Sequence, residues 1–230
     1  MYYEVTGEGE PLLLIHGFNL DTRLWDAQLQ AFAQTYKVIR FDIRGFGKTL
    51  ATDVPFTLYD DVKAVLLGLG IEKAHVAGLS FGGMVAQEFA LAYPQMVSSL
   101  ILVASGLFGH PRSEQRLHDV ERFNQVCQRG TTEEALEMTT QMWFDGPGQL
   151  VNEQAVEARN RFKEINRHAF SLPEFGAGLE TLSPSPIERL EEIKAPTLLP
   201  DSAHIPPMDQ PEVFNKLVLE FLAQSIVRSS

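Results

Sequence analysis

Short apolar runs separated by helical stretches are the feature that most limits how this chain can fold. Runs that are almost continuously apolar indicate strands buried on both faces, and the helical stretches between them indicate the crossovers that parallel strands need. We therefore predict an α/β fold, with a mostly parallel central sheet flanked by helices. The four predicted strands in the first half of the chain lie at 11–15, 36–41, 74–77 and 100–104.

Two crossover helices can be placed around the third of these runs. Residues 58–69 put Val62, Val65 and Leu66 on one face and end at Gly70, a residue that suits a helix stop. Residues 84–92 follow a pair of glycines and end before a proline, which cannot continue a helix. The order of elements up to residue 106 is therefore strand, helix, strand, helix, strand.

The strand signal disappears between 107 and 186, where helical signals replace it. Thr131 and Glu134 form a predicted capping box, and Asn152 can cap a further helix. A strand signal returns only at 196–199. We therefore predict an α/β core made of 1–106 and 187–230, interrupted by a helical cap at 107–186, which we name the cap segment.

Composition excludes several classes of function. The 230 residues carry a formal charge of -11, which repels nucleic acid and anionic membranes. Cys127 is the only cysteine, so neither an intramolecular disulfide nor a cysteine-based zinc site is expected. The first residues lack the pattern of a secretory signal, and no apolar run is long enough to span a bilayer. We expect a cytoplasmic protein that acts on a small molecule; nothing indicates its oligomeric state.

The sequence Gly78-Leu79-Ser80-Phe81-Gly82 fits the pattern G-x-S-x-G between a predicted strand and a predicted helix. A serine at such a turn is forced into strained backbone geometry and projects its hydroxyl above the sheet. A plain glycine-rich turn is the simpler explanation of the pattern, but the flanking strand and helix favour a nucleophile. We predict that Ser80 is catalytic.

A serine nucleophile needs donors for the oxyanion that forms when it attacks a carbonyl group. The backbone N–H of Phe81, at the start of the predicted helix, is one candidate, because the helix dipole favours negative charge there. The loop after an adjacent strand supplies the second, and Gly17 lets that loop approach closely, so we predict the N–H of Phe18. His16 is interpreted as a hydrogen-bonded structural residue beside the site.

Five motifs along the chain belong together: HGF at 16–18, FDIRGFG at 41–47, GLSFGG at 78–83, LILVASG at 100–106 and PDSAHIPPMDQPEVF at 200–214. With these motifs the chain resembles the α/β-hydrolase superfamily, in the branch that contains enol-lactonases, carbon–carbon bond hydrolases, esterases and cofactor-free haloperoxidases. The resemblance implies a serine, acid and histidine triad in that chain order, a helical cap, and neither a metal nor an organic cofactor. His204 matches the catalytic histidine of the family.

The chain departs from the family pattern where the acid is expected. Only four residues separate Leu199 from His204, too few for the helix and strand that normally intervene. Asp201 is the nearest carboxylate in sequence but suits a turn; Ser105 stands where some relatives carry an acid, and Asp145 cannot be placed. By the same resemblance, the chain starts at the second strand of the family. The triad acid is left unassigned.

Two other patterns have structural interpretations. Gly45 to Thr49 is similar to the end of a phosphate-binding loop, but Asp42 stands where that pattern requires glycine, so nucleotide binding is not expected. Asp42 and Arg44 are predicted to pair and brace the loop. Trp25 and most aromatic residues of the cap segment are predicted to pack in the interior, with one or two lining an apolar cleft: Trp143, Phe144, Phe162, Phe170 and Phe175.

The predicted function is that of a serine hydrolase acting on a small ester, lactone or related carbonyl compound, with Ser80 as nucleophile and His204 as base. The alternative is a catalytically impaired or inactive protein of the same fold, either a binding module or a deletion variant. The turn and the oxyanion loop favour the first, and the unassigned acid favours the second. Removal of a triad aspartate lowers turnover by about 10⁴ in a well-studied protease.

Overall fold

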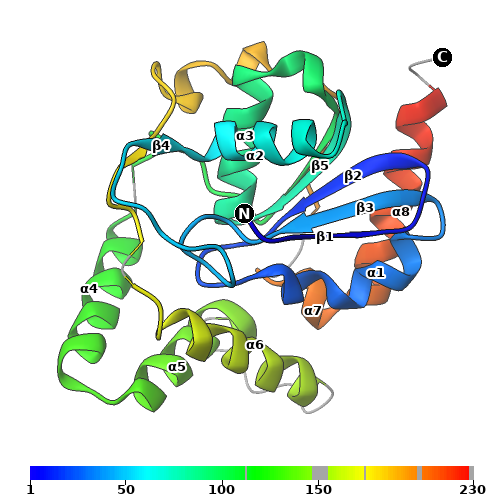
Figure 1. Ribbon diagram of the computed structural model, residues 1–230. Coiled ribbons are helices and arrows are strands. Elements are labelled where there is room, and N and C mark those ends of the chain that lie inside the picture. Colours follow the sequence, from blue (N-terminus) through cyan, green and yellow to red (C-terminus); the bar gives the residue numbers. More distant parts are fainter. Residues whose placement is uncertain (112, 147–154, 174, 201–203, 228–230) are drawn as a thin grey trace.

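A six-stranded sheet forms the centre of the computed structural model, which describes residues 1–111, 113–146, 155–173, 175–200 and 204–227 (Figure 1). The strand order is β1-β3-β2-β5-β6-β8, and every neighbouring pair is parallel except β1 with β3. The α/β fold with a mostly parallel sheet is therefore confirmed. The strands are β1 (Tyr3–Thr6), β2 (Glu10–Ile15), β3 (Tyr36–Phe41), β5 (Ala74–Leu79), β6 (Val97–Val103) and β8 (Thr197–Leu198).

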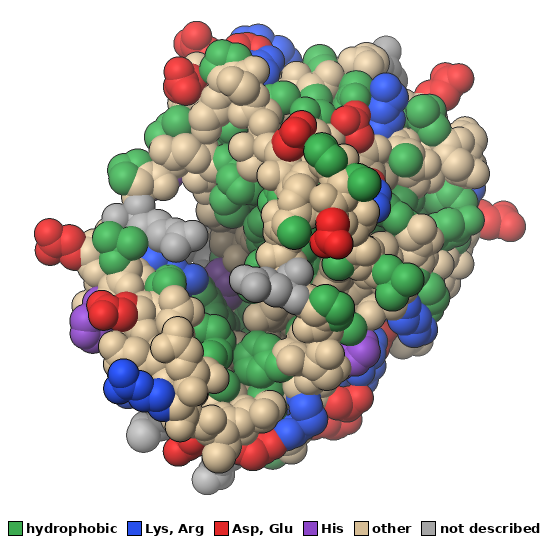
Figure 2. Space-filling model, turned by 60° about the vertical axis from the view of Figure 1, so that its left-hand side comes forward, with side chains coloured by type: hydrophobic (Ala, Val, Ile, Leu, Met, Phe, Trp, Pro, Cys, Tyr) green, Lys and Arg blue, Asp and Glu red, His purple; other side chains and the backbone are tan. Residues whose placement is uncertain are grey.

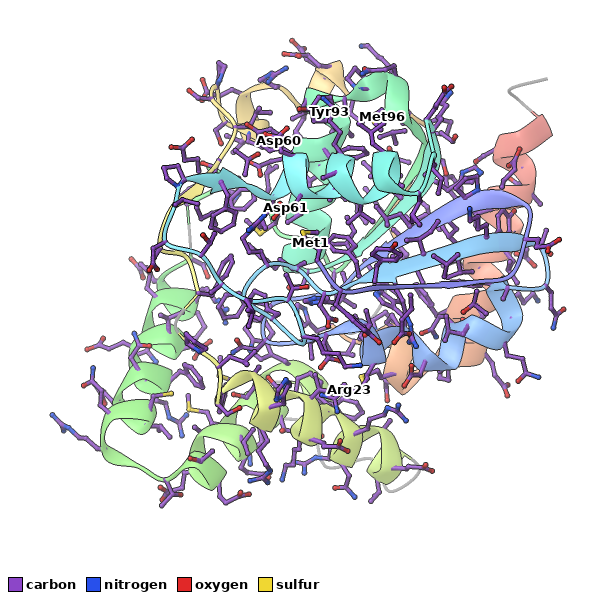
Figure 3. The ribbon with its side chains drawn as sticks, in the orientation of Figure 1. Met1, Arg23, Asp60, Asp61, Tyr93 and Met96 are labelled. Carbon is purple, nitrogen blue, oxygen red and sulfur yellow. The ribbon has the colours of Figure 1, made fainter. Side chains whose placement is uncertain are left out.

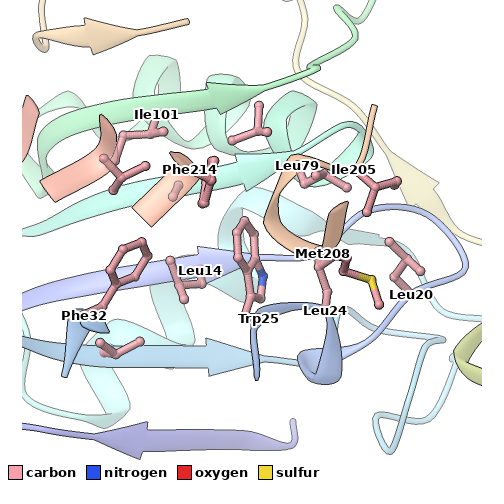
Figure 4. Close-up of a cluster of buried hydrophobic side chains, with 14 of the residues drawn as sticks. Leu14, Leu20, Leu24, Trp25, Phe32, Leu79, Ile101, Ile205, Met208 and Phe214 are labelled. Carbon is pink, nitrogen blue, oxygen red and sulfur yellow. The ribbon is translucent and has the colours of Figure 1, made fainter. Parts of the chain in front are cut away.

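Alternate residues of the strands enter two separate hydrophobic clusters. In β2, Leu12 and Leu14 belong to the cluster under α1 (Asp26–Phe32) and α8 (Pro211–Val227), whereas Leu13 and Ile15 belong to the cluster under α2 (Leu58–Gly68) and α3 (Phe81–Ala92). This alternation is what a sheet covered on both faces requires, because successive side chains point to opposite faces. Figure 4 shows part of the first cluster, around Trp25 and Phe214.

The two helices between the strands end within one residue of where the sequence predicts. Helix α2 stops at Gly68, and Gly70 just beyond it has a φ of +68°, which a residue with a side chain seldom adopts. The predicted helix at 84–92 is longer at its start, because α3 begins at Phe81. The Tyr93 hydroxyl donates a hydrogen bond to Asp60, which joins the end of α3 to the start of α2 (Figure 3).

The cap segment holds three longer helices that lie to one side of the sheet in Figure 1. They are α4 (Glu114–Arg129), α5 (Thr132–Thr140) and α6 (Val156–Ala169); the π-helical turn η3 (Gln141–Asp145) follows α5. The capping box of Thr131 and Glu134 is present, while Asn152 lies outside the described residues. The sequence predicts no strand in the cap segment, and this is wrong at one place: β7 (Leu179–Glu180) pairs in parallel with β4 (Phe56–Thr57). A strand of two residues is too short to give a periodic pattern in the sequence.

The chain reaches its last helix after β8 through a short helix, α7 (Pro206–Asp209). In the described part of the chain no strand follows β8, as the spacing between Leu199 and His204 predicts. The helices of the described residues include none that is both long and apolar enough to cross a membrane.

Candidate active site

Ser80 occupies the turn between β5 and α3, at the carboxyl edge of the sheet. Its φ of +53° and ψ of -111° lie outside the conformations that most residues with a side chain adopt. The Ser80 amide donates to the carbonyl oxygen of Val103 at 2.8 Å, which ties the turn to β6. Its carbonyl oxygen accepts from the amides of Gly83 and Met84, at 3.0 and 3.2 Å, in the first turn of α3. The strained turn is therefore fixed from both sides.

Glycines allow the backbone around Ser80 to pack more closely than any side chain permits. A Cβ atom on Gly78 would lie 2.3 Å from the carbonyl oxygen of Gly82. One on Gly82 would lie 2.4 Å from the carbonyl oxygens of Ile15 and His16. Because these neighbours are backbone atoms, they cannot move aside without moving a strand. The turn after β5 thus presses directly against the loop after β2.

The two predicted oxyanion donors lie on these touching segments. Phe18 follows β2, and Phe81 is the first residue of α3; their rings meet edge to face at 5.7 Å. Among the backbone hydrogen bonds of the described residues, none uses the amide of Phe18 or Phe81 as donor. The N-terminal end of α3 carries partial positive charge, which suits a developing anion. Their role as donors stays a prediction.

His16 is a structural residue, as the sequence analysis predicts. It is fully buried, its Nδ1 lies 2.8 Å from the carbonyl oxygen of Gly17, and its Nε2 accepts a hydrogen bond from the amide of Ile43 at 2.9 Å. These partners place the proton on Nδ1. Burial lowers the pKa of His16, so the ring is neutral at pH 7. It connects the loop after β2 to the loop after β3.

His204 reaches the same edge of the sheet through the chain that enters α7. The next residue, Ile205, packs beside Leu79 and Leu20 near the end of β5 (Figure 4). The His204 ring itself is half-buried and lies against Trp143, with 4.5 Å between ring centroids. Burial, and then the charge of Arg116, lower its pKa to about 4. Among the described residues no hydrogen bond joins the Ser80 hydroxyl to His204.

The candidate acids do not meet His204 in the described part of the chain. The Asp145 carboxylate binds Arg159, at 2.8 to 3.1 Å over three contacts, and its side chain is only 4% exposed. The Ser105 hydroxyl accepts from Gln87 at 2.8 Å and donates to the carbonyl of Gly106. Asp201 lies outside the described residues. The triad acid therefore remains unassigned.

Comparison with known proteins identifies the family. The family model for the alpha/beta hydrolase fold matches residues 10–133, which is more than half of the chain. The chain belongs to the alpha/beta hydrolase fold family. The matched region contains the strained serine turn and the loop after β2, whereas His204 lies beyond it.

Individual relatives of this alpha/beta hydrolase-fold chain carry hydrolase names. A pimeloyl-[acyl-carrier protein] methyl ester esterase of Aeromonas hydrophila is 38% identical over 103 residues, which cover 43% of this chain and 39% of that protein. Epoxide hydrolase 4 of Homo sapiens is 38% identical over 120 residues, covering 48% and 32%. The chain thus matches well under half the length of these relatives. The solved structure of a thermophilic esterase from Thermogutta terrifontis is 25% identical, covers 97% of this chain and 93% of its own, and has a TM-score of 0.73.

Aromatic side chains around the alpha/beta hydrolase site were only partly predictable. Phe144 and Phe162 pack together in the interior at 5.6 Å, as expected, and Phe170 meets Phe123 at 6.2 Å. Phe175 instead joins the rings of Phe18 and Phe81, at 6.0 and 5.7 Å. Figure 2 shows a hollow in the molecule with hydrophobic side chains and a histidine on its walls.

The predicted pair of Asp42 and Arg44 is wrong. Arg44 binds Asp61 of α2, at 2.5 and 2.8 Å, while the Asp42 carboxylate accepts from the amides of Thr22 and Lys48, both at 2.8 Å. Although the two residues are only two positions apart in sequence, the Arg44 side chain turns to helix α2 and the Asp42 side chain turns to the segments of Thr22 and Lys48. Among the described residues no group of three histidine, cysteine, aspartate or glutamate side chains is placed to hold a metal ion.

Proposed function

We propose that this chain is a serine hydrolase that cleaves small esters or lactones with Ser80 as nucleophile. The single observation that carries the proposal is the backbone of Ser80, held at a φ of +53° between β5 and α3, next to two amides that donate to no backbone acceptor within the described residues. Strain of this kind persists only where the surrounding structure imposes it, and it is frequent at catalytic residues.

In the proposed reaction the Ser80 hydroxyl oxygen attacks the carbonyl carbon while its proton passes to the His204 imidazole. The amides of Phe18 and Phe81 donate to the carbonyl oxygen as it gains negative charge. The carbon–oxygen bond to the leaving group then breaks, and the imidazolium returns its proton to the departing alcohol. The same imidazole then takes a proton from water as the water oxygen attacks the acyl carbon. The bond from that carbon to the Ser80 oxygen breaks, and the imidazolium returns the proton to Ser80.

Apolar surroundings favour an uncharged substrate. Four phenylalanine rings come together at this edge of the sheet: Phe18 meets Phe46, Phe81 and Phe175 at 5.2 to 6.0 Å. The Phe18 side chain is 51% exposed, so part of this aromatic wall is open to a ligand. The names of the Aeromonas and Thermogutta relatives, both esterases, support an ester substrate.

The test is covalent labelling with a fluorophosphonate, which reacts with activated serines. We expect the unaltered chain and Ser105→Ala to be labelled and Ser80→Ala not to be. Ser105 is a suitable control because it is the neighbouring serine at the same sheet edge and its hydroxyl is bound to Gly106. Hydrolysis of short-chain aryl esters should show the same order. Equal labelling of Ser80→Ala, with the fold intact by circular dichroism, would refute the assignment.

One observation favours a second candidate, a protein of this fold that binds a ligand without turning it over. Within the described residues, His204 has no hydrogen bond to Ser80 and no carboxylate partner. Hydrogen bonds between catalytic groups are often long before substrate binds, so turnover is the measurement that separates the two candidates. Saturable binding of a short ester by a well-folded chain that neither cleaves it nor reacts with fluorophosphonate would establish this second function.

A further inference from the structure

The indole ring of Trp143 contacts the imidazole ring of His204. The two ring centroids are 4.5 Å apart and the planes are inclined by 37°. Such an offset, tilted arrangement is a favourable geometry for aromatic rings, and it restricts rotation of the smaller ring. Trp143 belongs to η3 of the cap segment, whereas His204 lies at the entry to α7, so the contact joins two distant parts of the sequence.

A cation lies over the same indole ring. The guanidinium carbon of Arg116, from α4, is 4.1 Å from the Trp143 centroid. This distance is well within the range in which the electron-rich face of an indole attracts a cation. Arg116 therefore helps to fix the indole that contacts His204, and its charge reaches the imidazole, whose pKa it lowers.

Trp143 is itself held firmly by its neighbours in η3. The next residue, Phe144, is buried and packs on Phe162 of α6 at 5.6 Å. Asp145 binds Arg159 of the same helix. Trp143 also packs against the core cluster that contains Ile205, the neighbour of His204. The indole is thus anchored from both sides of the contact, by the cap segment and by the core.

We propose that Trp143 is a positioning residue that sets the orientation of the His204 imidazole by ring stacking. Its effect on catalysis rests on the proposed function, but the contact is testable without it. In a triad the acid both orients the imidazole and stabilises its charged form. The indole face of Trp143 orients the imidazole, whereas the charge of Arg116 destabilises the charged form of the imidazole. The stack therefore gives an oriented and neutral base.

Charges around the ring determine how the contact responds to pH. Arg116 is the charged group that acts on His204, and it disfavours the imidazolium. Other charged groups on the elements around the stack include Asp119 on α4, which accepts from Gln115; Asp145 of η3 and Arg159 of α6, which bind each other; and Asp209 at the end of α7. Replacing Arg116 by glutamine removes the repulsion, so the pKa of His204 should rise.

Tryptophan fluorescence tests the contact directly, because the chain has only two tryptophans. In a Trp25→Phe background all emission comes from Trp143, and imidazolium quenches indole fluorescence. In this background we expect the emission to be quenched below about pH 4. The quenching should be absent in Trp25→Phe/His204→Gln and should begin at higher pH in Trp25→Phe/Arg116→Gln. Far-UV circular dichroism at each pH shows whether the fold is intact. At pH 7, replacement of His204 by alanine should expose the indole and shift its emission to the red. Emission that is insensitive to residue 204 at both pH values would overturn the inference.

Labelling of Ser80 tests the catalytic consequence. We expect Trp143→Leu to lower the rate of fluorophosphonate labelling by about 100-fold, the scale associated with a misplaced catalytic group, and Trp143→Phe to restore most of it. Phe170→Leu is the matched control, since Phe170 is an aromatic residue of the cap segment whose ring partner is Phe123. In Arg116→Gln, the acid limb of the profile of labelling rate against pH should move to higher pH.

The outcomes separate the two proposals. Undiminished labelling of Trp143→Leu, or an equal loss in Trp143→Leu and Trp143→Phe at unchanged thermal stability, would overturn the positioning role. If no variant, including the unaltered chain, is labelled, the proposed hydrolase function fails. The fluorescence titration then still decides whether Trp143 orients His204, because it requires neither substrate nor turnover.

Discussion

The two sides of the candidate site are built in different ways. Every residue of β5, which leads into Ser80, is buried, whereas no residue of α4, which carries Arg116, is buried. On the strand side, backbone hydrogen bonds and glycine contacts fix Ser80 and the segments that carry the amides of Phe18 and Phe81. On the cap side, stacked and charged side chains at the edge of a more exposed helix hold the histidine. The comparison shows that the buried interior sets the position of Ser80 on the strand side, whereas contacts nearer the surface set the position of His204 on the cap side.

This difference predicts unequal sensitivity to substitution. Changes at the strand side disturb packed backbone, where neighbouring atoms cannot relax without cost. Changes at the cap side remove contacts that water can partly replace. Four substitutions test this contrast, in order of decreasing expected effect on the free energy of unfolding.

Gly82→Ala should have the largest effect, because the new Cβ would lie 2.4 Å from two backbone carbonyl oxygens of the loop after β2. We expect a loss of about 3 kcal/mol or more in the free energy of unfolding and loss of Ser80 labelling by about 100-fold. Urea denaturation and fluorophosphonate labelling measure the two quantities.

Gly68→Ala is the matched control for this substitution. Gly68 lies within α2, and a Cβ there would meet no atom within 4 Å. Alanine has the higher helix propensity, so we expect a gain of about 0.5 to 1 kcal/mol. Equal tolerance of both substitutions would mean that the strand side is not tightly packed, and the contrast would fail.

Asp42→Ala comes next, since it leaves the buried amide of Thr22 and the amide of the more exposed Lys48 without their acceptor. We expect a loss of about 2 to 3 kcal/mol in the free energy of unfolding. Asp42→Asn keeps one acceptor oxygen and should lose clearly less. Losses that are the same for both variants would show that the charge, and not the acceptor geometry, is what these loops require.

Glu88 tests the connection between the two sides. Its buried carboxylate on α3 accepts from the amide of Leu182, at 2.6 Å, where the chain returns from the cap segment. Burial raises its pKa to about 7, from 4.5 for an ordinary glutamate, so between these values the folded chain binds more protons than the unfolded chain. Stability should therefore fall as the pH rises through this window, by at most about 3 kcal/mol.

Glu88→Gln keeps an acceptor for Leu182 and removes the titration. We expect it to be more stable than the unaltered chain at pH 8, by about 1 to 3 kcal/mol, and equal to it below pH 4.5. Chemical denaturation at a series of pH values checks the prediction. A difference that grows toward low pH would have the wrong sign and would exclude the explanation.

Glu164→Gln should have the smallest effect. Glu164 of α6 accepts from Arg23 of the short helix η1 (Thr22–Trp25) at 2.9 Å, where the cap segment meets the core (Figure 3), and its side chain is 70% exposed. Exposed ion pairs contribute little, so we expect a change below about 0.5 kcal/mol that vanishes in high salt. A loss as large as that of Asp42→Ala would remove the distinction between the two sides.

The parts of the fold that local chemistry determines were predictable from sequence. The predicted strand at 36–41 agrees with β3, and the stop of α2 before Gly70 and the capping box at Thr131 are present, because each depends on neighbouring residues alone. The turn at Ser80 is predictable for the same reason: glycines, a preceding apolar run and a following helix lie within a few residues of it.

Contacts between distant segments were not predictable. The pairing of β7 with β4, the ion pair of Arg44 with Asp61, and the stack of Trp143 on His204 each join residues whose proximity depends on the whole fold. Asp42 and Arg44 lie two residues apart, yet the loop directs them to different partners. The triad acid is of this kind too, because only geometry can assign it once the usual spacing is lost.

The backbone at Ser80 has a consequence for attempts to transfer chemistry between proteins. A free peptide of the same five residues would relax within nanoseconds to ordinary dihedral angles, since nothing would resist the relaxation. The geometry at this serine is therefore imposed jointly by β5, β6 and α3, and a graft of the pentapeptide onto another scaffold would transfer the sequence without this geometry.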